Sequence, residues 1–257
     1  MPLNDRPGLR GPANFLFNQR NFGAQPRLAA LGEERMTLQG TINKSFLLLV
    51  VLMAGAFWTW SQYLTTGNAA LIQVPMIGGV IAGLVLALII SFRATTAPYL
   101  AIPYAACEGL AIGGISALFE RRYPGIAIQA VGLTFAVLAA MLIGYKSGLI
   151  RVTQRFRAIV VGATGAIMLF YLVSMVLSLF HVATPFLYGS SSLSIGISLL
   201  IIGVAALNLA LDFDMIDVGV SQGAPRYMEW YSAFGLLVTL VWLYLEILRL
   251  LANLRQR

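Results

Sequence analysis

Residues 71–92 read LIQVPMIGGVIAGLVLALIISF and contain no charged side chain. A helix needs about 20 predominantly apolar residues to cross the hydrocarbon core of a bilayer. The apolar residues of this stretch do not alternate with polar ones, as they would in a strand of a membrane barrel. Residues 71–92 therefore predict a transmembrane helix.

Six further apolar runs have a similar length, at residues 46–64, 99–119, 125–145, 158–180, 193–211 and 233–254. The whole chain has 257 residues, of which 59% are hydrophobic and 11% are charged. A soluble domain has about 25% charged residues, more than twice the share in this chain. Disordered chains contain few apolar residues, so that class is excluded as well. The sequence predicts an all-α integral membrane protein, a bundle of seven transmembrane helices with antiparallel neighbours.

The chain divides at about residue 44. Residues 1–44 are polar and arginine-rich, and they lack the apolar core and the cleavage site of a signal peptide. They resemble a mitochondrial transit peptide in their arginines but contain no serine. We expect residues 1–44 to form a mostly disordered tail and residues 45–257 to form the transmembrane domain.

The basic residues predict the orientation in the membrane. With the tail in the cytoplasm, 12 of the 17 lysines and arginines lie on the cytoplasmic side, as the positive-inside rule favours. Seven spans then place the C-terminus outside, whereas a last helix that returned before crossing would leave it inside. The net charge of +7 thus reflects membrane topology, and we expect the lipid bilayer, not nucleic acid, as the partner.

Four acidic residues lie within or at the edge of apolar runs: Glu108, Asp212, Asp214 and Glu246. An ionisable residue at this depth usually marks an ion pathway or a structural pair. Glu246 lies deep in the last run, where it can pair with Arg249 one turn away or point into the bundle core. Glu108 can pair with an arginine or line a polar cavity.

Asp212, Asp214 and Asp217 crowd the end of the sixth run. Asp214 and Asp217 share a helical face, and Asp212 points nearly opposite to Asp214. Carboxylates are unfavourable at the C-terminal end of a helix, so three of them there suggest a nearby cation, either arginine or Ca²⁺. Two close carboxylates can share a proton, which would make a pH sensor without histidine. The alternative is that all three are solvated charges, above all Asp217.

Other features carry weaker signals. Arg93 ends the second run, as a cytoplasmic anchor or as a counter-charge to the acidic residues. The pairs Gly79-x-x-x-Gly83 and Gly109-x-x-x-Gly113 predict close helix contacts.

The chemistry of an enzyme is not indicated. A single histidine, His181, and a single cysteine, Cys107, argue against a zinc site or a Cys–His pair. No phosphate-binding loop, nucleophile elbow or protease motif is present. We expect no enzymatic activity and no cofactor.

The sequence resembles the Bax inhibitor family, in its bacterial YccA-like branch. The similar segments are MTLQGTINK at 36–44, Glu-Gly-Leu at 108–110, Leu-Asp-Phe-Asp at 211–214, and residues 227–250 from the motif MEW onward. The resemblance implies a bundle whose last helix is central. It also implies a bacterial inner (cell) membrane, and a pH-sensitive Ca²⁺ leak gated by carboxylates on the last two helices.

Residue by residue, the resemblance implies that Asp214 and Glu246 form the proton-sensing pair, with Arg93 as its partner and Ca²⁺ near the two acids. Glu246 stands where the family has aspartate. Glu108, Asp212 and Asp217 are secondary candidates. The second hypothesis is an interaction protein, since some bacterial relatives are associated with the membrane protease FtsH. In that case the polar tail would engage the partner.

Overall fold

The computed structural model describes residues 35–180 and 192–256. Within them the chain forms seven helices that are long and apolar enough to cross a membrane, which confirms the predicted fold. They are α2 (Leu38–Thr66), α3 (Ala69–Phe92), α4 (Ala97–Arg122), α5 (Ile126–Lys146), α6 (Gln154–Leu179), α7 (Ser192–Ser221) and α8 (Tyr227–Arg255). A 3₁₀ turn, η2 (Ala94–Thr96), joins α3 to α4.

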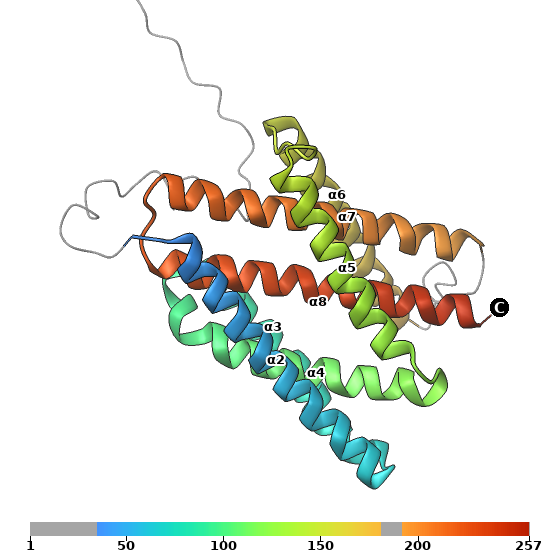
Figure 1. Ribbon diagram of the computed structural model, residues 1–257. Coiled ribbons are helices and arrows are strands. Elements are labelled where there is room, and N and C mark those ends of the chain that lie inside the picture. Colours follow the sequence, from blue (N-terminus) through green and yellow to red (C-terminus); the bar gives the residue numbers. More distant parts are fainter. Residues whose placement is uncertain (1–34, 181–191, 257) are drawn as a thin grey trace, which may run out of the picture.

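The last helix, α8, is central. It contacts α2, α4, α5 and α7, and α7 runs beside it along most of its length (Figure 1). Figure 1 also shows α2, α3 and α4 together on one side of α8, with α5 crossing over the bundle. With 29 unbroken residues, α8 is about 44 Å long, so it can cross the bilayer completely.

Several helices extend beyond the apolar runs that predict them. α2 begins at Leu38, so residues 38–44 belong to the first helix and not to the tail. Thr37 caps α2, because its hydroxyl accepts a hydrogen bond from the Gly40 amide at 3.0 Å. The rest of the predicted tail, residues 1–34, lies outside the described residues, as does His181.

The end of α7 corrects one expectation. The sixth apolar run stops at residue 211, yet α7 continues to Ser221. Asp212 and Asp214 therefore lie inside the helix, more than a turn before its end, and the unfavourable dipole at a helix terminus does not apply to them. The helix continues because the apolar residues between the acids are buried and Asp214 is paired with Arg157.

Glycines set the closest helix contacts, as predicted. Gly109 and Gly113 of α4 lie against the backbone oxygens of Leu52 and Ala56 on α2, and a Cβ on either glycine would overlap them. Gly79 of α3 packs equally closely on the carbonyl oxygen of Cys107. These contacts join α2, α3 and α4 into one layer beside α8.

Candidate functional site

Five buried polar side chains form one line along α8, at Glu229, Ser232, Thr239, Glu246 and Asn253. The last four are spaced by seven residues, and two helical turns bring each of them back to the same face. None is more than 8% exposed. Ser232 stands one turn after Glu229, so the line begins near the first turn of α8 and ends near its last. Glu229 faces α2, where it pairs with Lys44. We call the other four residues, together with the side chains facing them on α7, the polar seam.

α7 supplies the opposite side of the seam with Ser194, Ser198 and Asp212, which are all buried. The short connection over residues 222–226 makes α7 and α8 antiparallel neighbours. Asn253 therefore meets Ser194, donating a hydrogen bond from Nδ2 to Oγ at 3.4 Å. Nearer the connection, the Asp212 carboxyl contacts Thr239. Asp212 Oδ1 would lie 3.8 Å from a Cβ on Gly235.

Three buried side-chain oxygens of the described residues lack a hydrogen-bond partner within the protein: Asp212 Oδ2, Ser232 Oγ and Glu246 Oε2. All three belong to the polar seam. Leaving a buried polar atom unpaired costs about 1–3 kcal/mol, and more for a charged group. A seam that retains three such atoms is suited to accept a proton, a cation or water.

Glu246 combines both of the roles expected from the sequence. Its Oε1 accepts hydrogen bonds from Arg249 Nη2 and from the Tyr171 hydroxyl of α6, each at 2.5 Å. Arg249 Nη2 also donates to the Tyr171 hydroxyl at 2.6 Å, and its guanidinium lies 5.0 Å from the centre of the tyrosine ring. The carboxylate is thus ion-paired through Oε1, while Oε2 is buried without a hydrogen-bond partner among the described residues.

Asp214 makes a different contact. Its Oδ2 accepts a hydrogen bond from Arg157 Nη2 at 2.5 Å, which joins α7 to α6. Asp217, on the same side of α7, accepts from the Tyr145 hydroxyl of α5 at 2.9 Å and is exposed. The opposite directions expected for Asp212 and Asp214 are therefore observed. Arginine is the cation beside Asp214.

The structure does not bring Asp214, Glu246 and Arg93 together. Asp214 lies seven residues before the end of α7, and Glu246 lies 19 residues after the start of α8. In an antiparallel pair this separates them by about 18 Å along the helix axes. Arg93 is exposed at the end of α3. The described ion pairs of the two acids use Arg157 and Arg249 instead.

Glu108 also stands apart from the seam. It lies in the α3–α4 interface, where its Oε1 would be 3.0 Å from a Cβ on Gly83. Within the described residues, no group of three or more histidine, cysteine or acidic side chains could hold a metal ion. A Ca²⁺ site between Asp214 and Glu246 is therefore not assembled by these side chains.

Sequence reasoning missed an ion pair between the first turn of α8 and α2. The buried Glu229 carboxylate pairs with Lys44 of α2 and accepts hydrogen bonds from the Thr37 amide and hydroxyl at 2.7 and 2.8 Å. Lys44 was expected in the tail, and 185 residues separate it from Glu229. The available signal was that both lie in the segments that carry the family resemblance.

Comparison with known families identifies one match. The profile of the family described as Bax inhibitor 1 like matches residues 14–256. Comparison with curated proteins and with solved structures gives no match. The match confirms the family and does not distinguish the YccA-like branch.

Proposed function

Because the chain belongs to the Bax inhibitor 1-like family, we propose that it is a pH-sensitive cation leak protein of a membrane, with Ca²⁺ as its ion. The observation that carries this proposal is the polar seam. Its two ends, Ser232 and Asn253, are 21 residues apart on α8, about 32 Å. This distance exceeds the ~30 Å thickness of the hydrocarbon core. Buried polar groups at this depth are characteristic of ion and proton pathways.

The two seam carboxylates, Asp212 and Glu246, are the residues we assign to the ion and the proton. Each carries one oxygen without a partner in the protein, so each can bind a proton or help to replace the hydration of a passing cation. Oxygen ligands suit Ca²⁺. Cations would meet Asp212 and Glu246 one after the other, since a three-acid cluster is absent from the described residues.

Helix α6 is the element we assign to gating. It is held to α7 by Arg157 and Asp214, and to α8 by Tyr171, which bonds both Glu246 and Arg249. Protonation of Glu246, the seam carboxylate bonded to Tyr171 of α6, removes the negative charge from its ion pair with Arg249 and weakens the hold on α6. A shift of a few kcal/mol is enough to change the populations of closed and open states. Acidification should therefore favour the open state.

The experiment is dye-reported Ca²⁺ flux into proteoliposomes between pH 6 and pH 8. Asn and Gln imitate the protonated acids, so Asp212→Asn and Glu246→Gln should change the flux at neutral pH and flatten its pH dependence. Asp217→Asn is the matched control, because Asp217 is an exposed acid of the same helix. Replacing Ca²⁺ with K⁺ in the same vesicles tests the choice of ion.

Two results would contradict this assignment. Wild-type flux and pH dependence in Asp212→Asn and Glu246→Gln would remove the seam carboxylates from the pathway. An absence of flux from folded wild-type protein would favour the interaction-protein hypothesis instead. Deleting residues 2–35 should then abolish capture of an FtsH-type membrane protease.

A further inference from the structure

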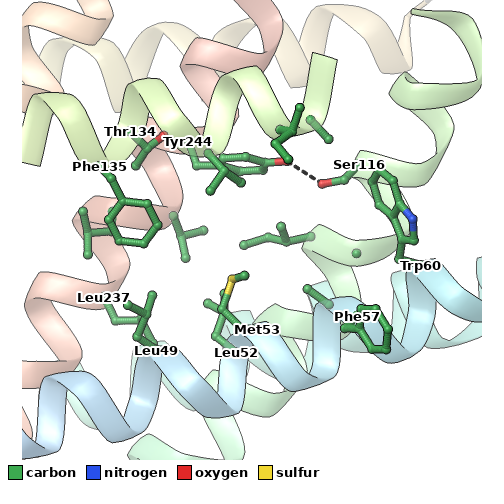
Figure 2. A pocket seen from close by; sticks show the side chains of 18 residues that line it. Leu49, Leu52, Met53, Phe57, Trp60, Ser116, Thr134, Phe135, Leu237 and Tyr244 are labelled. Atoms are coloured by element: carbon green, nitrogen blue, oxygen red, sulfur yellow. Dashed lines mark hydrogen bonds between the residues drawn. The ribbon is translucent and has the colours of Figure 1, made fainter. Parts of the chain in front are cut away.

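A cavity of about 390 Å³ lies between α2, α4, α5 and α8 (Figure 2). It faces away from α7, so it is distinct from the polar seam and from the proposed leak. Its volume falls within the ~300–1,000 Å³ typical of small-molecule sites. Figure 2 shows Phe57 and Trp60 of α2 on one side and Thr134 and Phe135 of α5 on the other.

The cavity opens toward the bilayer. At its rim, Phe57 is 72% exposed and Ile128 is 77% exposed, and both lie within membrane-spanning helices. The medium outside the opening is therefore lipid hydrocarbon. Side chains around an unfilled space lose dispersion contacts, and an acyl chain entering from the bilayer restores them.

The lining offers little to water. The hydroxyls of Ser116 and Tyr244 are joined to each other at 2.6 Å at one wall, and most of the other lining residues are apolar. An internal water needs two to four polar partners. The lining therefore favours a hydrocarbon occupant.

Positive charge lies beyond one end of the cavity. Arg121 and Arg122 are exposed at the end of α4, five and six residues after Ser116, which is about 8–9 Å along the helix. Arg255 of α8 reaches the same turn, donating to the Pro124 carbonyl at 2.7 Å.

The nearest acid, Glu120, is already engaged. Its carboxylate accepts hydrogen bonds from the amides of Gly125 and Ala127, at 2.5 and 3.1 Å. The Arg122 guanidinium lies 5.8 Å from the centre of the Tyr123 ring, and both arginines are exposed, so they can attract an anion at the depth of lipid headgroups.

We propose that this cavity binds one acyl chain of an anionic phospholipid, whose phosphate lies against Arg121 and Arg122. The acyl chain enters between α2 and α5, and the lipid headgroup stays at the membrane surface beside the α4–α5 turn. Apolar side chains of the cavity bind the acyl chain, and the two arginines select a negatively charged headgroup.

Native mass spectrometry of the full-length protein tests the proposal, with phosphatidylglycerol and phosphatidylcholine of identical acyl chains. One phosphatidylglycerol should be retained in preference to phosphatidylcholine. The double variant Arg121→Gln/Arg122→Gln should weaken its binding on the order of tenfold. The control Arg151→Gln/Arg155→Gln removes two exposed arginines from the opposite end of the bundle and should have no effect.

Binding of the acyl chain in the cavity is tested separately, with substitutions that fill the cavity. Val131→Trp from α5 and Met53→Trp from α2 fill the cavity from opposite sides, and both should abolish retention. Leu133→Trp, at a 45% exposed position of α5 outside the cavity lining, should not. Circular dichroism confirms that each variant is folded.

Three outcomes overturn the proposal. Equal retention of the two lipids contradicts the headgroup site. Unchanged retention in both folded Trp variants contradicts the cavity as the acyl-chain site. Loss of retention in Leu133→Trp as well shows that the lipid binds the outer surface of α5 instead.

Discussion

At the scale of single residues, the two carboxylates of the seam differ in how they are held. Glu246 shares one oxygen between Arg249 and Tyr171, so its charge is balanced within one turn of α8 and across to α6. Asp212 contacts Thr239 and forms no ion pair within the part of the chain that the structure describes. We therefore expect Asp212 to be the more sensitive of the two to the ion or proton that occupies the seam.

Tyr171 is predicted to couple α6 to the seam. Tyr171→Phe removes the hydroxyl that donates to Glu246 and accepts from Arg249, which should lower stability by about 1–2 kcal/mol and raise the leak at neutral pH. Unfolding in SDS, followed by circular dichroism, measures the first effect, and vesicle flux measures the second. Tyr99→Phe is the control because Tyr99 is 79% exposed. Equal stability and leak in the two variants would contradict the coupling.

At the scale of elements, the bundle has a tight half and a polar half. α2, α3 and α4 meet through glycines that let their backbones touch, whereas α6 is held to α7 and α8 by ion pairs and hydrogen bonds. Close packing resists displacement, and charged contacts respond to pH. The movable element should therefore be α6, not the glycine-packed layer.

The glycine contact gives an element-scale prediction. A Cβ at position 109 would overlap the Leu52 carbonyl oxygen and lie 3.1 Å from its Cα, so Gly109→Ala must push α2 away from α4. Overpacking of this kind costs about 1–3 kcal/mol. Gly132→Ala on α5, where nothing lies within 4 Å, should be neutral or stabilising. Thermal unfolding in detergent compares them, and equal stability would refute the close contact.

The helices also show which features of the fold the sequence could predict. Apolar length alone predicts seven helices, because only a helix satisfies its own backbone in lipid. The positions of helix ends were less predictable, since packing carries α7 past Asp212 and Asp214. Helical periodicity shows that these two acids point apart. Which of them faces α8 depends on tertiary packing that no local pattern reveals.

The sequence could not predict ion-pair partners that lie far apart along the chain, because these too depend on tertiary packing. Arg157 and Lys44 looked like residues of a loop and a tail, and their acids, Asp214 and Glu229, lie 57 and 185 residues away. Glu246 and Arg249 lie one turn apart on one helix, so that pair could be foreseen. The family resemblance supplied the acidic motifs but joined Asp214 to Glu246, which the structure separates.

At the scale of the whole molecule, an odd number of spans places the two ends of the described chain on opposite faces of the membrane. The distribution of lysine and arginine predicts that the N-terminal face is cytoplasmic. In inside-out vesicles of a bacterial inner membrane, a protease should remove an N-terminal tag and spare a C-terminal tag. Digestion of both tags would contradict seven complete spans, and the reverse pattern would contradict the orientation.

The central claim is that the polar seam between α7 and α8 is a path for cations. Substituted-cysteine labelling tests it most directly, in a Cys107→Ser background that removes the native cysteine. Cysteines at Ser232, Thr239 and Asn253 should react with a small cationic thiol reagent, faster at pH 6 than at pH 8, and Ca²⁺ should slow the reaction. A cysteine at Leu243, buried on α8 outside the seam, should stay unreactive. Equal, pH-independent labelling at Thr239 and Leu243 would contradict a path along the seam.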